Sequence, residues 1–564
     1  MPFLVVAALV VAIHLVIALG AWSGVGLLAD DREMIGGAIL RHRGVWTLGE
    51  AFLPAPAAEA TRALYRPFID LVFWLEQPWF GIEAFGYHVV NSGLHCTTAL
   101  LWCGLVRRWS GSLLAGVATA VLFVGWPGHS EATHWIAART NVMSTCLLSF
   151  ALLAHDRGLA RAGARRLPWL GLGALLAAVA IGTKESAVFV VPVAAAMAWL
   201  RLPSAPSLGR RLVAAGLVML PMAVATFGCL AFRAARLGTW GSGSHYGWKA
   251  QRVGAGACAD WLQVMLAPAH ATYAPVWAPW LLGISTLLLL AVAATALRTA
   301  AARAAAGPAF VLLGLGVAAL PARAAIGVLG GLVVLHAFVL DANRQSWRRV
   351  SAVYTTMREQ VLERARATQQ PVRAIDAPAV YDGAFGLLNG YTDFLFWQQT
   401  AAPGTNLRGA VSSALEWPAV LHELAAAAGQ KQLAMPTFVV RWDDGALVPL
   451  VLDERWPLAP WPGCTIAYAR IARERPFAGA PLPVHVLLQT DHEVHCTLVA
   501  KAGEAEWTGA TVAVAATARP APLALTIPLP ATLPAGASVA ITLRIAVGER
   551  QQAFALGQTS IGAR

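Results

Sequence analysis

Long apolar runs separated by short polar loops occupy the chain up to about residue 343. An apolar segment of about 17–25 residues crosses a lipid bilayer as a helix, because a helix pairs every backbone N–H and C=O group internally. The pattern predicts about eleven such helices, several of them short for this role. They lie near residues 3–28, 86–106, 112–127, 139–154, 168–183, 186–200, 212–232, 254–268, 278–297, 308–321 and 324–341.

From about residue 345 onward, the polarity is that of a soluble protein. Residues 351–369 predict a helix, and mixed helix and strand signals continue to Leu452. After Pro481, apolar and polar residues alternate between Pro and Gly residues, which is typical of a β-sandwich. The clearest alternating segments begin at Val484, Thr511, Leu523 and Val539.

These patterns divide the chain into three parts. We predict a polytopic α-helical membrane region at residues 1–343, a soluble mixed α/β segment at 344–460 and a β-rich, sandwich-like domain at 461–564. The soluble part of the sequence contains no nucleophile elbow, P-loop or metal motif. We therefore expect it to be an accessory or substrate-docking region.

The composition supports a membrane protein, since 57% of the 564 residues are hydrophobic, 13% are charged and the mean hydropathy is +0.58. Soluble proteins carry about 25% charged residues, so the surplus apolar surface must face lipid. The first run, Phe3 to Leu28, is interrupted only by His14 and is too long for the apolar part of a signal peptide. The segment Gly20-Ala21-Trp22 is also a poor cleavage site. We therefore expect a retained first helix.

The net charge of +12 does not indicate nucleic-acid binding, because the arginines lie mainly in short loops between apolar runs. Basic loops of this kind set the topology of membrane proteins. With the N-terminus in the cytosol, the arginine-rich loops at 107–108, 157–166 and 201–211 lie inside. The basic stretch from Arg233 to Arg252 then lies outside, against the rule. We accept this violation, because a site that handles phosphate needs basic groups.

The side on which the C-terminal tail emerges depends on the weak apolar run 254–268. If this run spans the membrane, the tail is outside. If it only dips into the membrane, the tail is cytosolic, which Arg348 and Arg349 would favour. The seven cysteines show no CxxC pair and no zinc-type spacing. Cys464 and Cys496, both in the tail, can form a disulfide if the tail is extracytoplasmic.

The first outer loop, about residues 29–84, contains the first candidates for chemistry. Asp30 and Asp31 directly follow the first helix, and acidic residues at a membrane boundary are candidates for function. They can equally mark the end of the helix in water, and their position alone leaves both readings open. Further on, Tyr65 and Arg66 precede Pro67 and an amphipathic, aromatic-rich helix that we expect to lie in the membrane interface. An ordinary aromatic belt explains this segment equally well.

Two more outer loops supply His129, Glu131 and Arg139, and then Lys184 with Glu185. Each group has an ordinary explanation, structural histidines in one loop and a solvated turn in the other. Their predicted convergence on one side of the membrane favours a functional role over these ordinary explanations. Together the three loops supply carboxylates and phosphate-binding cations, the combination that a lipid-phosphate sugar donor needs. The carboxylates are Asp30, Asp31 and Glu131, and the cations are Arg139 and Lys184.

A series of motifs in this order carries a family resemblance. It consists of Asp30-Asp31, Tyr65-Arg66-Pro67, Tyr87-His88 with Asn91 and His95, Pro127-Gly-His129-Ser-Glu131, Trp135 to Arg139, and Lys184-Glu185. The series resembles the GT-C glycosyltransferases, specifically the protein O-mannosyltransferase and TMTC-like branch. The resemblance covers residues 1–200 well and 201–340 loosely. The tail lacks the tetratricopeptide repeats of the TMTC proteins, so the acceptor cannot be carried over.

The resemblance implies a GT-C-like fold and a polyprenyl-phosphate monosaccharide as donor. It implies that Asp30 or Asp31, with the first favoured, is the general base that deprotonates an acceptor hydroxyl. An adjacent like charge would raise the pKa of that carboxyl group toward the working range. Arg139 and Lys184 would hold the leaving phosphate. A single displacement would invert the anomeric centre.

The remaining candidates position donor or acceptor: Tyr65, Arg66, His129, Glu131 and Glu185. Glu131 has a second possible role, as a ligand of a divalent cation. The sequence contains no metal motif and identifies no certain cofactor. We read His88, Asn91 and His95, at helical spacing, as packing or donor-channel residues.

The leading hypothesis is therefore an inverting transferase of the bacterial inner membrane that moves one sugar from a polyprenyl phosphate to a periplasmic protein or glycan. Its active site and tail would both be periplasmic, and the resemblance favours that side for the tail. The alternative is a transporter or flippase of lipid-linked glycans, which would place charges inside helices of two matched halves. A sensor or assembly protein ranks last, because an anchor needs only one or two spans.

Overall fold

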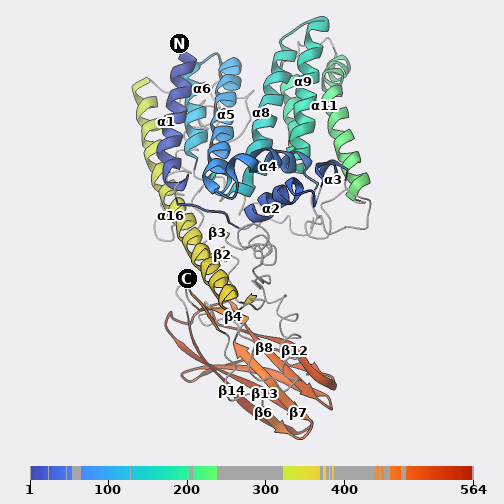
Figure 1. Cartoon of the computed structure of the whole chain (residues 1–564). Coiled ribbons are helices and arrows are strands. Elements are labelled where there is room, and N and C mark those ends of the chain that lie inside the picture. The colour runs from blue at the N-terminus through green and yellow to red at the C-terminus, as the bar shows by residue number, and fades with distance from the viewer. Residues whose placement is uncertain are drawn as a thin grey trace. The chain divides into compact units, whose positions relative to one another are not determined.

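The chain divides into two compact units in a computed structural model (Figure 1). One unit comprises Met1–Ala352 with Asp382–Ala384, and the other comprises Val353–Tyr381 with Phe385–Arg564. The structure describes residues 2–22, 24–28, 30–45, 47–53, 65–126, 129–201, 207–237, 322–368, 373–375, 380–381, 384–385, 439–443, 446–449, 458–471 and 478–561. The helices expected near 254–268, 278–297 and 308–321 lie outside these residues. The three-domain division stays a prediction.

The first unit is helical, and its long helices confirm the apolar runs as helices. They are α1 (Pro2–Trp22), α5 (Ala84–Ser110), α6 (Leu113–Gly125), α8 (Arg139–Leu159), α9 (Leu167–Thr183), α10 (Val190–Arg201) and α11 (Leu208–Leu237). Within the described residues, four helical stretches are long and apolar enough to cross a membrane: Ala84–Ser110, Ile136–Leu159, Gly163–Thr183 and Leu208–Arg236. The segments Val5–Leu15 and Leu113–Gly125 are shorter apolar helices.

The first helix ends at Trp22, before the expected end at Leu28. Two glycines, Gly24 and Gly26, follow it, and glycine is a poor helix former. The segment is then held by side chains, since Ser351 accepts a hydrogen bond from the N–H of Gly26 at 2.7 Å. This early end lets the chain turn before Asp30.

Short helices fill the polar segments between the long ones, and Figure 1 shows α2, α3 and α4 at one end of the long helices. They are α2 (Asp31–His42), α3 (Leu48–Phe52), α4 (Pro67–Phe80), α7 (Ser130–His134), η2 (Ile136–Ala138), η3 (Gly163–Arg166) and η4 (Glu185–Phe189). The helix expected after Arg66 is α4, with Pro67 in its first turn. It contacts α2, α3, α5 and α9.

One helix, α16 (Ala322–Thr368), contains 47 residues. The sequence predicts two helices here, near 324–341 and 351–369, with a domain boundary at 343. The helix is continuous because its polar middle contains neither Gly nor Pro between Gly331 and Thr368. Asp341 pairs within the helix with Arg344, and Asn343 donates a hydrogen bond to Ser130 Oγ at 3.1 Å.

The second unit contains β-strands. Its first strands are β1 (Arg373–Ile375), β2 (Val380–Tyr381), β3 (Ala384–Phe385), β4 (Val439–Asp443) and β5 (Ala446–Pro449). Strand β4 lies between β1, its parallel neighbour, and β5, its antiparallel neighbour. This small mixed sheet falls in the segment expected to be mixed α/β.

The remaining strands form two antiparallel sheets that share one core, and we call them the two-sheet region. They are β6 (Leu458–Trp461), β7 (Cys464–Ile471), β8 (Pro481–Thr490), β9 (Val494–Ala502), β10 (Ala505–Thr508), β11 (Val512–Val514), β12 (Thr517–Pro528), β13 (Ser538–Val547) and β14 (Arg550–Ser560). One sheet has the order β12-β8-β7-β6, and the other has the order β10-β9-β13-β14 with β11 beside β9. The four alternating segments are thus confirmed as strands. Cys464 and Cys496 are buried in the shared core as free thiols, one in each sheet.

Candidate functional site

Asp30 and Asp31 are neighbours in the chain, but their carboxylates lie in different environments. Asp31 is only 1% exposed, and both of its oxygens are occupied. One accepts a hydrogen bond from the N–H of Leu28 at 3.0 Å, and the other accepts one from the N–H of Ala137 at 2.5 Å. Asp31 therefore holds the start of α2 against η2. Asp30 precedes α2, but its side chain does not cap the helix.

The Asp30 carboxylate is largely buried, and its Oδ1 has no hydrogen-bond partner among the described residues. Burial raises the pKa of Asp30 to about 6, the charge of Glu33 adds to this rise, and the charge of Arg66 opposes it. The pKa rise thus comes from burial first and from Glu33 as the like charge. A carboxyl group with this pKa is mostly ionised at neutral pH and can still accept a proton.

Arg66 and Glu185 form a two-pronged ion pair that joins α4 to η4. Arg66 Nε donates to Glu185 Oε2 at 3.2 Å, and Nη2 donates to Oε1 at 3.0 Å. Burial opposes the ionisation of Glu185. The hydrogen bonds and charge of Arg66, together with the charge of Arg233, nevertheless hold its pKa below the ordinary value. Glu185 is therefore ionised, and both of its oxygens are engaged.

Lys184 directly precedes Glu185 in the chain, and its Nζ donates to Asn141 Oδ1. Burial lowers the pKa of Lys184 and the charge of Arg66 lowers it further, while Glu185 and Glu131 act in the opposite direction. Lys184, in the third outer loop, is thus within electrostatic reach of the first loop through Arg66 and of the second loop through Glu131. Pairwise charge interactions link Asp30 to Arg66, Arg66 to Lys184 and Glu185, and Lys184 to Glu185 and Glu131.

Arg139 lies in a different setting, fully buried at the start of α8. Its Nη1 donates to Glu76 Oε1 at 2.5 Å, its Nη2 donates to the carbonyl oxygen of Tyr87 at 2.8 Å, and its Nε donates to Asn91. All three nitrogens therefore have protein acceptors. This arrangement favours a structural role, and the phosphate role expected for Arg139 stays a prediction.

Glu76, which the sequence analysis missed, is the partner that occupies Arg139. Burial raises the pKa of Glu76, and the charge and hydrogen bond of Arg139 oppose the rise. A carboxylate in the middle of an aromatic-rich helix, Pro67–Phe80, was the available signal. Such a group needs a buried cation beside it.

Tyr65 and His129, two further predicted site residues, contact aromatic rings and backbone carbonyl groups. The Tyr65 hydroxyl donates to the carbonyl oxygen of Phe52 at 2.9 Å, and its ring lies 5.9 Å from that of Phe232. His129 lies against His95, with ring centroids 5.1 Å apart, and its Nδ1 is 3.0 Å from the carbonyl oxygen of Phe123. Burial lowers the pKa of His129 to about 4, so the ring is neutral at neutral pH.

Arg233 on α11 also acts on this site. It is 6% exposed, and its charge stabilises ionised Glu185. The sequence signalled it only as the first residue of the basic stretch that violates the charge rule. Among the described residues, no group of three or more His, Cys, Asp or Glu side chains could hold a metal ion.

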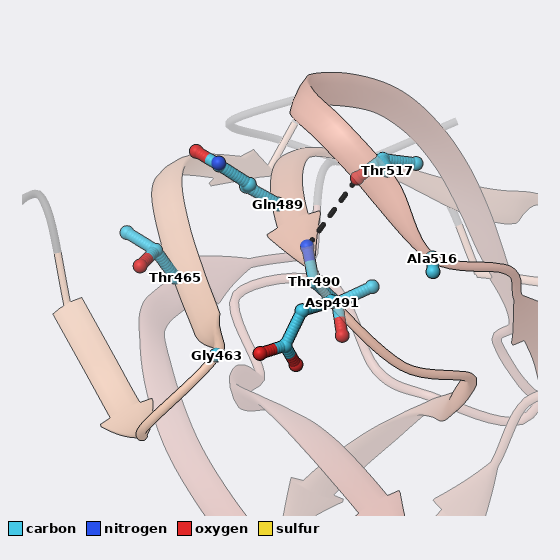
Figure 2. A pocket seen from close by; sticks show the side chains of 7 residues that line it. All are labelled: Gly463, Thr465, Gln489, Thr490, Asp491, Ala516 and Thr517. Atoms are coloured by element: carbon cyan, nitrogen blue, oxygen red, sulfur yellow. Dashed lines mark hydrogen bonds between the residues drawn. The ribbon is translucent and has the colours of Figure 1, made fainter.

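The two-sheet region has a separate pocket of about 410 Å³ (Figure 2). Its lining is mainly polar and includes Thr465, Gln489, Asp491 and Thr517. The N–H of Thr490 donates to Thr517 Oγ1 at 3.3 Å. None of the predicted site residues lines this pocket.

Comparison with curated proteins identifies relatives of the helical part. Protein O-mannosyl-transferase Tmtc2 of Drosophila melanogaster is 29% identical over 184 residues, which cover 30% of this chain and 19% of the fly protein. Protein O-mannosyl-transferase TMTC1 of Homo sapiens is 34% identical over 134 residues, which cover 23% of this chain and 15% of the human protein. The N-terminal part of the chain is distantly homologous to the TMTC protein O-mannosyltransferases. The family resemblance seen in the motifs is thus confirmed.

The TMTC homology covers only part of each protein, since the chain matches 19% or less of the length of these two relatives. No family model matches the chain, and no solved structure matches it. The distant similarity to TMTC proteins suggests a membrane glycosyltransferase.

Proposed function

We propose that this protein is an inverting glycosyltransferase with a GT-C-like membrane fold and a sandwich-like accessory domain. It moves a monosaccharide from a polyprenyl phosphate to an extracytoplasmic protein hydroxyl or glycan, in the bacterial inner membrane. The observation that carries the proposal is the buried Asp30 carboxylate, which lacks a hydrogen-bond partner at Oδ1 within the described residues and interacts with Arg66. The distant TMTC homology supports the same reaction class.

In the proposed reaction, Asp30 accepts the proton of the acceptor hydroxyl. The hydroxyl oxygen forms a bond to C1 of the sugar as the bond between C1 and the phosphate oxygen breaks. The electron pair of that bond stays on the phosphate, which leaves with one more negative charge. Attack from the face opposite the phosphate inverts C1.

Asp30 is a better base than Asp31 for a geometric reason. Both oxygens of Asp31 already accept backbone hydrogen bonds, so they are engaged within the protein and not directed at an acceptor hydroxyl. Asp30 has a pKa of about 6, close to the range in which a general base works best. Asp31 therefore positions the loop that carries Asp30.

Lys184 and Arg66 are the cations that balance the leaving phosphate. Both interact with each other and with the carboxylate of Glu185, so a dianionic phosphate here enters a group of cations that is already assembled. Preorganised cations stabilise developing negative charge without rearranging during the reaction. Glu131, His129 and Tyr65 line or support the approach of donor and acceptor.

Transfer by the purified protein tests the proposal. Radiolabelled polyprenyl-phosphate sugars are incubated with the wild type, Asp30→Asn and Asp31→Asn in the presence of peptide and glycan acceptors. Asp30→Asn is expected to lose about 1,000-fold in transfer rate with an unchanged thermal midpoint. Asp31→Asn is expected to lower the thermal midpoint. Full activity of Asp30→Asn would remove the proposed mechanism.

A further inference from the structure

Arg233 has an unusual hydrogen-bonding state for a buried cation. Its Nε and Nη2 atoms are buried and have no hydrogen-bond partner among the described residues. The side chain as a whole is 6% exposed. An unpaired buried guanidinium is costly, because its N–H groups have given up water without gaining an acceptor.

The carboxylate that interacts with Arg233 does not accept a hydrogen bond from its Nε or Nη2. Glu185 attracts Arg233 by charge, but Glu185 Oε1 and Oε2 both accept hydrogen bonds from Arg66. Arg233 thus interacts with the site through an opposite charge, and its Nε and Nη2 have no acceptor in the described part of the chain. An anionic oxygen ligand would satisfy them.

The free atoms also have a specific geometry. The Nε–H and one Nη2–H lie on the same edge of the guanidinium plane and point in parallel, so this edge binds two oxygens of one group at once. Arg66 uses the same pair of atoms to bind the two oxygens of Glu185. On Arg233 this edge can receive two oxygens of a phosphate.

We infer that Arg233 binds the phosphate of the lipid-linked sugar donor, completing a subsite with Arg66 and Lys184. This inference rests on the proposed function. The three cations come from α4, from the end of α9 and from α11, so the subsite forms only when these segments pack together. As the bond to C1 breaks, the phosphodiester monoanion becomes a phosphomonoester dianion, and Arg233 stabilises the added charge.

The test compares Arg233→Gln and Arg233→Lys with Arg210→Gln. Arg210 is exposed on the same helix, and its substitution is the matched control. Transfer is measured against donor concentration, and binding of the sugar-free polyprenyl phosphate is measured by its stabilisation of the protein against heat.

We expect Arg233→Gln to lose about 100-fold in kcat/KM for the donor and to lose the stabilisation by polyprenyl phosphate. Arg233→Lys should retain an intermediate rate, because it keeps the charge and loses the two-pronged contact. Arg210→Gln should match the wild type.

Several results would overturn the inference. Wild-type kinetics and binding in Arg233→Gln would do so while leaving the proposed function intact. So would equal, Arg233-dependent stabilisation by phosphatidylglycerol vesicles or inorganic phosphate, which would identify a different anion. Loss of folding in both Arg233 variants would assign a structural role. If the wild type transfers no sugar, the proposed function fails, while Arg233-dependent binding of polyprenyl phosphate would still support this subsite.

Discussion

Two buried arginines of the helical unit differ in what surrounds them. Arg139 donates to Glu76, Tyr87 and Asn91, and we call these four residues the closed cluster. Arg233 has two buried nitrogens without a partner in the described part of the chain. It belongs, with Asp30, Arg66, Lys184 and Glu185, to what we call the open cluster. Both clusters contain buried charge, so burial alone does not distinguish structure from function.

The two clusters differ in how many of their buried polar atoms have a hydrogen-bond partner. A buried charge whose donors and acceptors are all matched by protein groups stabilises a packing arrangement and has nothing left for a ligand. A buried charge with unmatched atoms gains a partner when a ligand binds. Among the described residues, the open cluster has three such atoms, Asp30 Oδ1 and Arg233 Nε and Nη2, whereas the closed cluster has one, Glu76 Oε2. The open cluster is therefore the better candidate for chemistry, although the sequence predicts both Arg139 and Lys184 as phosphate ligands.

The largest effect is expected from breaking the closed cluster. Arg139→Met leaves Glu76 buried without its cation, and we expect a loss of about 3–5 kcal/mol in stability. The thermal midpoint in detergent measures it. The double variant with Glu76→Met should be more stable than Arg139→Met alone, since it removes the unpaired charge. A double variant no more stable than Arg139→Met would contradict the unpaired-charge explanation.

A smaller effect is expected from the open cluster at Lys184. Lys184→Met removes one of the proposed phosphate cations, and we expect kcat/KM for the donor to fall by about 10- to 100-fold with little change in thermal midpoint. Arg161→Gln, an exposed cation outside both clusters, is the control. A large loss of stability with unchanged kinetics in Lys184→Met would move Lys184 to the structural class.

The smallest effect concerns pH. Because a general base must be unprotonated, kcat/KM should be constant above pH 7 and should fall as the pH drops through the Asp30 pKa of about 6. Glu33 is one cause of that raised pKa, so Glu33→Gln should move the acid limb to lower pH. Glu549→Gln, in an exposed turn, should leave it unchanged. An acid limb that does not respond to Glu33 would assign it to another group.

Many helices of the first unit and strands of the two-sheet region were predicted from the sequence. The length of an apolar run predicts the helices and the alternation of apolar and polar residues predicts the strands, and both are local properties. Contacts between the outer loops were also expected, since every second loop of a series of membrane helices returns to the same side, and Arg66 pairs with Glu185. The long helix α16 did not, because a change from apolar to polar composition between 341 and 350 resembles a boundary although nothing there breaks a helix.

Within the site, the sequence identified Asp30, Arg66, Lys184 and Glu185 but not their states. Whether Asp30 or Asp31 is available depends on the N–H of Ala137, which is 106 positions further along the chain. The occupation of Arg139 by Glu76 depends on how α4 packs, which no local pattern encodes. Tertiary contacts decided each of these points.

The bond between Asp31 and Ala137 also sets an order of assembly. The loop that carries Asp30 can reach its final form only after α5, α6 and η2 have been synthesised, since Ala137 follows all but the end of η2. The ion pair of Arg66 can form only after Glu185 has been synthesised, and the charge interaction of Glu185 with Arg233 forms later still. A nascent chain that stops before residue 130 therefore carries Asp30 without the contact between Asp31 and Ala137, and the candidate site is complete only late in biosynthesis.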